Sequence, residues 1–356
     1  MDVLKPSVIW IGNRCYRRNP MLQREGNFAE EDFTDDITDR VYCDETCDES
    51  VDVRETKDGF TVSMDIPSVF FKFIIGKKGE TRKNLEAETR TQIRIPKLGQ
   101  EGEVVILGHD KQGVCSAKTR VDVMVETARQ REPFTHFLSL PINSDLVRIK
   151  FDDFKDDILR ECDGDRGLDR TIFQNPLKLH LTAGTLVLLT KKEIQKAVDV
   201  LQQCQQDLVE PILKGEGLHY AVKGLEYMND DPNAVDVLYA KLISPDEDDR
   251  LQILADQLVD KFTSLGLMQH QYDRVKLHVT VMNSLMRKEP TAVERTRHER
   301  GTGSGKQRES FDASKILKKF GSYDFGTYHF NTLHLSQRHS SSPDGYYTCA
   351  GSIALP

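Results

Sequence analysis

The sequence predicts an α+β protein with two folded domains behind an acidic tail. The first observation is compositional: residues 1–56 hold 7 Lys and Arg against 14 Asp and Glu, with few large apolar side chains. The second is the order of strand-like and helix-like apolar patterns in residues 57–131, where a glycine loop separates two helices. The third lies in residues 132–356, where one six-residue pattern occurs twice, as Leu177–Thr182 and as Val275–Thr280.

Length and charge limit the classes of function. A chain of 356 residues can form two or more cores. The net charge of −8 excludes a protein that is basic throughout, so any nucleic-acid contact must be a local basic surface. Seven Cys at irregular spacing indicate reduced thiols, as in the cytosol or nucleus. No stretch has the length of a membrane span, and no signal peptide is recognisable, so we expect a soluble intracellular protein without membrane contact.

Residues 1–56 are predicted to be largely disordered, because their composition cannot bury enough apolar surface. The segment Val3–Ile11 differs, since it holds Trp10 and is followed by Arg14, Arg17 and Arg18. Such a cluster is typical of a docking segment that orders on a partner subunit. A strand packed on the chain's own domain explains it equally well.

Residues 57–131 follow the order strand, helix, glycine loop, helix, strand, strand, helix. These elements are expected at 60–66, 69–75, 80–90, 92–96, 103–107 and 111–130, with the loop Gly76-Lys77-Lys78-Gly79 between the first two helices. Two glycines permit a tight loop and a close approach to the backbone. The amides that begin the second helix favour phosphate, and two lysines add positive charge there.

This order of elements and this loop resemble a KH domain of the eukaryotic type. The resemblance implies binding of single-stranded RNA or DNA. Its predicted contact residues are Ile75, Gly76, Lys77, Lys78, Gly79, Ile93 and Arg94. A groove lined by Ile74, Ile75, Ile93 and Ile95 would hold about four nucleotides, although Arg94 alternates with the isoleucines and can face the other side of the sheet. Arg90 departs from the family pattern, in which a glycine commonly ends the second helix.

The second domain is predicted to consist of two similar lobes. Strands are expected at 135–141, at 177–182 with a turn at 183–184 and a continuation to 189, at 218–228 and at 235–243. Helices are expected at 150–161, 191–212 and 246–265. The stretch 287–310 has almost no apolar side chains and is predicted to be a mobile loop.

Both copies of the repeated pattern alternate like half-buried strands, so Lys, His and Thr share one face of each strand. If the strands pair, His180, Thr182, His278 and Thr280 converge over one cleft. Two imidazoles at one phosphate suit general acid–base catalysis, and two hydroxyls can hold phosphate oxygens. We expect Lys178 and Lys276 to form a solvated rim, and His334 in a third, incomplete copy to be structural.

The paired His-x-Thr motifs, together with the stretches 311–317 and 345–353, resemble the two-histidine phosphoesterases, in particular the branch found in A-kinase anchoring proteins. The resemblance implies a bilobal fold and a reaction, without metal or cofactor, on a 2′-linked or 2′,3′-cyclic phosphate at an RNA end. The alternatives are a pocket that only binds phosphate while partner subunits catalyse, and a pure interaction scaffold.

Overall fold

The computed structural model describes residues 8–11, 14–17, 53–57, 59–97, 102–244, 249–269, 273–287 and 308–356. The chain divides into two compact units, Met1–Pro133 and Phe134–Pro356. The predicted disorder of 1–56 concerns mostly residues outside the described ones, as does most of the predicted mobile loop 287–310. Within the described ranges, no helix has both the length and the apolar character needed to cross a membrane.

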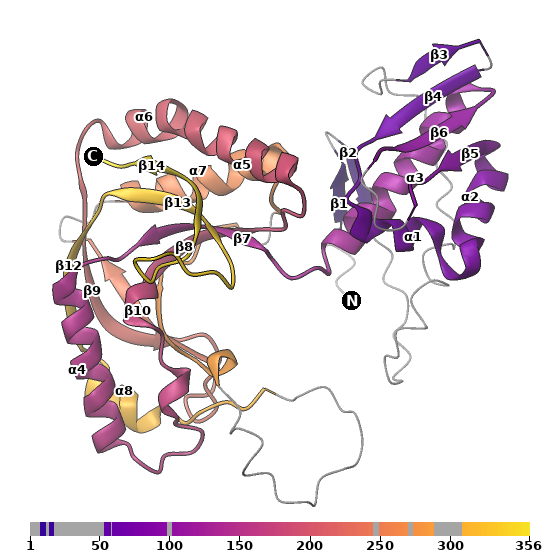
Figure 1. Ribbon diagram of the computed structural model, residues 1–356. Helices are drawn as coiled ribbons and strands as arrows, with labels where there is room; N and C mark the ends of the chain where they lie inside the picture. Colours follow the sequence, from indigo (N-terminus) through magenta and orange to yellow (C-terminus); the bar gives the residue numbers. More distant parts are fainter. Residues whose placement is uncertain are drawn as a thin grey trace, which may run out of the picture. The chain divides into compact units, whose positions relative to one another are not determined.

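From Gly59 onward the first unit has the expected order of strands and helices (Figure 1), and it adds a strand at Arg54–Thr56, which the sequence had placed in the disordered tail. Its sheet has the order β3-β4-β6-β5, and all neighbours are antiparallel. The strands are β3 (Arg54–Thr56), β4 (Gly59–Met64), β5 (Thr91–Arg94) and β6 (Val104–Gly108). The helices are α1 (Phe71–Ile75), α2 (Glu80–Thr89) and α3 (Lys111–Arg129), with short 3-10 turns η1 (Ser68–Phe70) and η2 (Lys77–Gly79). Strands β1 (Val8–Ile11) and β2 (Arg14–Arg17) form a separate hairpin, and the backbone of β1 lies beside α3.

The loop between α1 and α2 needs its first glycine. Gly76 has φ 68°, and a Cβ at this position would lie 2.0 Å from the Thr81 Oγ1 atom. The second glycine, Gly79, has φ 81°, and Lys78 between them also has positive φ. The backbone therefore turns within the four residues between the end of α1 and the start of α2.

Arg90 occupies the position where helix α2 ends, with φ 52° and ψ 40°. This left-handed conformation is the one that favours glycine, and it costs other residues about 1–2 kcal/mol. The departure from the KH pattern noted in the sequence therefore affects the helix cap and leaves the glycine loop as expected.

The second unit contains one curled eight-stranded sheet with the order β12-β9-β10-β11-β8-β7-β13-β14. The strands are β7 (His136–Pro141), β8 (His180–Leu186), β9 (Leu218–Tyr227), β10 (Val237–Ile243), β11 (Val279–Asn283), β12 (Asp324–Phe330), β13 (Thr332–Gln337) and β14 (Cys349–Ala354). The two halves meet where β11 pairs with β8, through the register pair Val279 and Leu181. Each half therefore contributes one histidine-bearing segment, as predicted.

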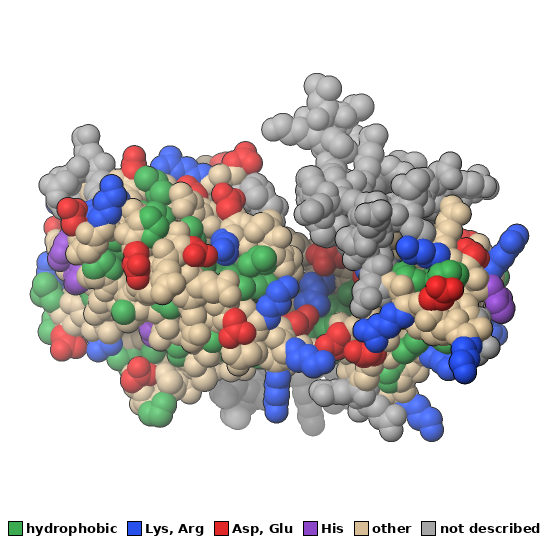
Figure 2. All heavy atoms as spheres, turned by 90° about the horizontal axis from the view of Figure 1, so that it is seen from above, with side chains coloured by type: hydrophobic (Ala, Val, Ile, Leu, Met, Phe, Trp, Pro, Cys, Tyr) green, Lys and Arg blue, Asp and Glu red, His purple; other side chains and the backbone are tan. Residues whose placement is uncertain are grey.

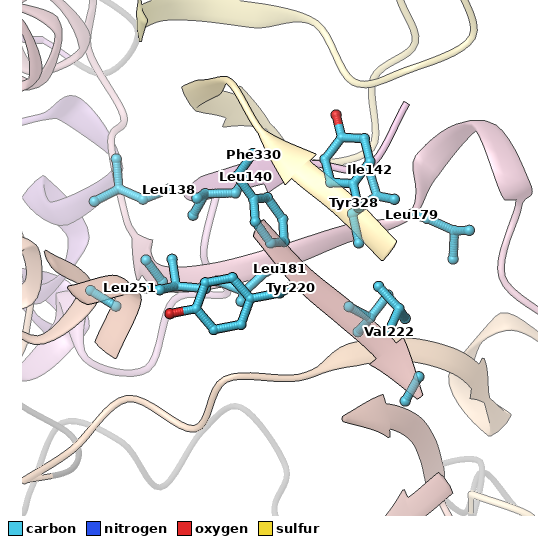
Figure 3. Packing of buried hydrophobic residues seen from close by; sticks show 14 of the residues in the cluster. Leu138, Leu140, Ile142, Leu179, Leu181, Tyr220, Val222, Leu251, Tyr328 and Phe330 are labelled. Carbon is cyan, nitrogen blue, oxygen red and sulfur yellow. The ribbon is translucent and has the colours of Figure 1, made fainter. Parts of the chain in front are cut away.

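Helices pack on the sheet and enclose its core (Figure 1). They are α4 (Asp145–Glu161), α5 (Lys191–Cys204), α6 (Glu210–Leu213), α7 (Arg250–Ser264) and α8 (Ser314–Phe320), with a π-helical turn η5 (Gln205–Val209) between α5 and α6. Short 3-10 turns are η3 (Arg170–Ile172), η4 (Pro176–Lys178) and η6 (Ser284–Met286). Leu179 and Leu181, which flank His180, belong to the buried cluster that also contains Leu140 and Tyr220 (Figure 3).

Two expectations for the second unit were wrong. The predicted turn at 183–184 does not exist, because β8 continues to Leu186 and only its pairing with β7 shifts register there. Gly184 suits this continuous strand, since the Met268 side chain lies 2.6 Å from where a Cβ would be. The repeated pattern is also not a strand throughout. Residues 176–178 form the turn η4, and 275–278 precede β11, so each strand begins only at or after its histidine.

We predict that Arg90→Gly stabilises the first unit by about 1 kcal/mol, because glycine adopts the left-handed cap without the Cβ penalty. Amide hydrogen exchange of α2 and β5 in the intact chain measures the change. The exposed Lys83 in the middle of α2 is the matched control, since Lys83→Gly should destabilise the unit by a similar amount. Equal exchange rates in the wild type and Arg90→Gly would show that the cap conformation is not strained.

Candidate functional site

The register of β8 and β11 places the four predicted catalytic residues in two cross-strand pairs next to each other. Leu181 pairs with Val279 in an antiparallel ladder, and both side chains are buried. One step to either side of this pair sets His180 opposite Thr280 and Thr182 opposite His278. Since alternate residues of a strand share a face, all four side chains lie on the face opposite the buried Leu181 and Val279. The structure therefore brings together the constellation that the sequence predicted.

Each imidazole is held by the backbone of its own motif. The Nδ1 atom of His180 lies 2.7 Å from the Lys178 carbonyl oxygen, and the Nδ1 atom of His278 lies 2.6 Å from the Lys276 carbonyl oxygen. A carbonyl oxygen only accepts, so Nδ1 is the protonated nitrogen in both rings. The Nε2 atoms are consequently the nitrogens available to accept or donate a proton at a ligand.

A tyrosine stands beside each histidine, in a nearly symmetric arrangement. Tyr347 packs edge-on to His180 with ring centroids 5.5 Å apart, and Tyr239 packs on His278 at 5.3 Å. The Lys178 ammonium lies 4.6 Å from the centre of the Tyr347 ring, and the Lys276 ammonium lies 4.8 Å from the centre of the Tyr239 ring. In both copies the lysine thus contacts the tyrosine with its side chain and the histidine with its carbonyl.

The two lysines differ in their other contacts. Lys178 donates to the Ser340 carbonyl and the Ser341 hydroxyl, both at 2.8 Å, and so ties the segment before Tyr347 to the motif. This differs from the solvated rim that the sequence predicted. Lys276 stays exposed, as predicted, and the Tyr239 hydroxyl beneath it donates to Glu226 at 2.8 Å.

Burial keeps both histidines neutral in the free site. The pKa of His180 is lowered to about 4, mainly by burial and to a smaller extent by the nearby His278, while the hydrogen bond to the Lys178 carbonyl opposes the shift. Burial also lowers the pKa of His278, helped by the positive charge of Lys276 and opposed by the Lys276 carbonyl. A bound phosphate would oppose both shifts, because its negative charge favours the imidazolium form.

The threonine hydroxyls are available for a ligand. Thr182 and Thr280 are both half-buried, and among the described residues neither hydroxyl has a hydrogen-bond partner. Hydroxyl groups in such positions can donate to phosphate oxygens. Two Nε2 atoms and two hydroxyls therefore converge on one patch of the sheet.

The third histidine lies elsewhere. His334 is in β13, paired with Ser139 of β7, so one whole strand separates it from β8. Its Nδ1 atom is buried without a hydrogen-bond partner among the described residues, and burial lowers its pKa. Its structural role stays a prediction.

In the first unit, the glycine loop leaves its charged side chains exposed. Lys77 and Lys78 both face solvent, and no side chain caps α2, so the first-turn amides remain available to a phosphate. Ile75 is half-buried beside the loop, and Arg94 is exposed at the end of β5. These positions suit the predicted binding surface.

The isoleucine groove differs from the prediction. Ile93 is 2% exposed and Ile74 is fully buried, so both belong to the core of the unit. Alternation along β5 explains this, because Ile93 faces the helices while Arg94 faces away. Ile75 and Ile95 are the two isoleucines of the predicted groove that reach the surface.

Sequence reasoning missed both tyrosines. Tyr347 lies in the stretch 345–353 that carried the family resemblance, but nothing in its spacing indicates contact with His180. Tyr239 lies in the predicted strand 235–243, directly opposite Thr280 in the register of β10 and β11. Only the strand order, which places β10 next to β11, reveals that neighbour.

Comparisons with known proteins agree with this architecture. The family description "AKAP7 2′5′ RNA ligase-like domain" matches residues 134–355, and the description "KH domain" matches residues 61–122. Activating signal cointegrator 1 complex subunit 1 of Mus musculus is 47% identical over 328 residues, which are 91% of each chain. The predicted fold class, a KH domain followed by a phosphoesterase-like domain, is confirmed.

Two solved structures of similar proteins align with somewhat less than two thirds of the chain. The protein TT0787 of Thermus thermophilus is 16% identical, with a TM-score of 0.38, and the alignment covers 62% of this chain and 97% of that one. E. coli LigT complexed with 3′-AMP is 13% identical, with a TM-score of 0.36, and the alignment covers 63% and 99%.

We predict that His180 titrates with a pKa of about 4, well below the ordinary value for histidine. In the unfolded chain His180 takes up a proton near pH 6.5, whereas in the folded chain it does so only near pH 4. The free energy of unfolding therefore decreases as the pH falls from about 6.5 to 4, because only the unfolded state binds this proton in that range. Histidine-selective NMR of the intact chain follows the titration, with His180→Gln to identify the signal. A His180 signal that titrates near 6.5 would contradict the lowered pKa.

Proposed function

Because the chain belongs to the AKAP7 2′5′ RNA ligase-like family, in a branch that also carries a KH domain, we propose that it is a nucleic-acid-binding subunit of a cointegrator complex. The KH unit grips single-stranded RNA or DNA. The second unit acts on a 2′-linked or 2′,3′-cyclic phosphate at an RNA end, by acid–base chemistry of two histidines without a metal or cofactor. The observation that carries the proposal is the Nδ1 anchoring of both imidazoles, which leaves both Nε2 atoms available.

The geometry supports the following course for the proposed reaction on a cyclic phosphate. His180, with its pKa lowered to about 4, is neutral and accepts a proton from the attacking water at Nε2. The water oxygen bonds to phosphorus, and the bond from phosphorus to one ribose oxygen breaks. His278, protonated in the complex, donates its Nε2 proton to that oxygen. Thr182 and Thr280 hold the non-bridging oxygens, where negative charge develops.

A binding function is the second candidate. Both imidazoles are neutral in the free site, so the site holds no imidazolium acid until a ligand raises one pKa. A pocket of this kind can also bind a terminal phosphate through hydroxyls and neutral Nε2 atoms without turnover. The chain is then an RNA-binding adaptor, and other subunits catalyse.

The name of the mouse relative supports membership of a cointegrator complex. We propose the other subunits of that complex, including a helicase, as partners, with roles in transcription regulation and DNA damage repair in the nucleus. Charged side chains of both signs are interspersed on the face shown in Figure 2. The nucleic-acid contacts that we propose are at the glycine loop and at the paired histidines.

We predict that the intact chain hydrolyses a dinucleotide that ends in a 2′,3′-cyclic phosphate. His180→Ala and His278→Ala should each lower kcat by about 10²–10⁴-fold, since each removes one proton-transfer group. The double variant should lose little more than either single variant, because the two groups act as a unit. Thr182→Val should cost at most about 10²-fold, and His334→Ala should change little.

The pH profile and a chelator test the same mechanism. The rate should fall at low pH, where His180 becomes protonated, and at high pH, where His278 loses its proton, which gives a bell-shaped profile. The rate should be unchanged by a chelator. Loss of activity on chelation, with recovery on adding a divalent ion, would refute the mechanism, and absence of turnover on all such substrates would favour the binding function.

We predict that Lys77→Asp combined with Lys78→Asp weakens single-stranded RNA binding on the order of tenfold or more at low salt, because two positive charges at the phosphate-facing amides become negative. A binding titration with labelled RNA measures it. Lys57→Asp combined with Lys111→Asp changes the net charge equally at exposed positions outside the loop and is the control. Equal affinities of the two double variants would show that the loop is not the contact.

A further inference from the structure

An aromatic series leads away from His180 in the second unit. The ring of Phe137 lies 5.2 Å from His180 and 5.0 Å from Tyr347, measured between centroids. Phe134 packs edge-on to Phe137 at 6.2 Å, and the Arg338 guanidinium carbon lies 4.1 Å from the centre of the Phe134 ring. Each member of the series therefore contacts the next, from the guanidinium to the imidazole.

The ends of this series are accessible. Phe137 is buried, whereas Phe134, Arg338 and Tyr347 are each half-buried. The buried ring fixes the positions of its neighbours, and the others present part of their surface to solvent. This is the arrangement expected of a rigid stacking platform rather than of a closed core.

The two cations of the series lie over aromatic rings and away from acidic groups. Among the described residues, neither Arg338 nor Lys178 has a carboxylate within ion-pair distance. Lys178 lies over Tyr347, and Arg338 lies over Phe134 while its Nη1 donates to the Phe134 carbonyl at 3.4 Å. Within the described residues, neither positive charge is therefore neutralised by a carboxylate, and both lie beside aromatic rings.

We propose that Phe134, Arg338 and Tyr347 form a subsite for the nucleotides that precede the terminal phosphate of a single-stranded RNA. A base stacks on the Phe134 and Arg338 side chains, and the backbone phosphates lie near Arg338 and Lys178. The inference rests on the proposed function and adds the substrate class: the site takes an oligonucleotide end in preference to a mononucleotide.

Stacking and charge together favour this ligand. Every base offers a π-face to an aromatic ring or a guanidinium plane, and every linkage carries one negative charge. In the binding mode that we propose, a mononucleotide that ends in the reactive phosphate does not contact Phe134 and Arg338. The subsite therefore distinguishes ligands by the number of nucleotides.

The test compares two uncleavable probes, a 2′-phosphate mononucleotide and a trinucleotide with the same end, by equilibrium binding. The intact chain is used with Lys77→Asp and Lys78→Asp in place, so that the KH unit does not dominate binding. We expect the trinucleotide to bind roughly tenfold or more tightly than the mononucleotide. A trinucleotide whose first two nucleotides are abasic should lose most of that gain.

Variants test whether the higher affinity for the trinucleotide comes from the subsite. Phe134→Leu and Arg338→Gln should each remove most of the trinucleotide gain and leave mononucleotide binding unchanged, whereas Phe134→Tyr should keep the gain. Arg338→Lys, which keeps the charge and loses the planar group, should be intermediate. The exposed Arg160 on α4 supplies the charge-matched control Arg160→Gln. Thermal melts must show that the variants remain folded, and Arg338→Gln serves if Phe134→Leu does not fold.

The outcomes separate the two proposals. Equal binding of both probes, or a gain that survives Phe134→Leu and Arg338→Gln in folded protein, overturns the subsite while the phosphate site stands. Loss of mononucleotide binding in a His180→Ala and His278→Ala variant supports the phosphate site independently of the subsite. If the chain with Lys77→Asp and Lys78→Asp, and with no change in the second unit, binds neither probe, both proposals are overturned.

Discussion

The pairing of β8 with β11 is the constraint on which the second unit depends. The two halves of the sheet are joined there by the register pair Leu181 and Val279, whose buried side chains face the core. A slip of one residue would turn the histidines and threonines into the core and the apolar residues to the surface, and burial of the apolar set opposes this strongly. The same packing that closes the sheet therefore sets the geometry of the candidate site.

The histidines of this site are oriented by backbone carbonyls rather than by carboxylates. Each Nδ1 contacts the carbonyl of the lysine two residues earlier, which is possible because residues 178 and 276 lie just before the strands, outside their regular backbone. A carboxylate partner would raise the pKa of a buried imidazole, whereas burial here lowers it. In the mechanism that we propose, this arrangement gives a neutral base at His180, and the bound ligand raises the pKa of the acid His278.

In the first unit, the conformation of the backbone forms the candidate binding surface. Gly76 admits a turn that any Cβ would block against Thr81, and an uncapped α2 leaves amides available beside two exposed lysines. The nucleic-acid surface we propose thus depends on the absence of a Cβ at Gly76 as much as on the charges of Lys77 and Lys78. Arg90 at the end of α2 adds strain without altering the loop.

The order of elements, the KH loop and the four residues of the paired motif could all be predicted from the sequence, because alternation and glycine spacing are local properties of the chain. The same reasoning predicted the wrong state for 183–184 and placed Ile93 in a groove, since a bulge and the packed side of a strand depend on neighbouring strands. The contacts of Tyr239 and Tyr347 with the histidines, and of Arg338 with Phe134, follow only from the arrangement of the strands in space. These contacts join residues far apart in the chain, and their formation depends on which strands become neighbours in the sheet.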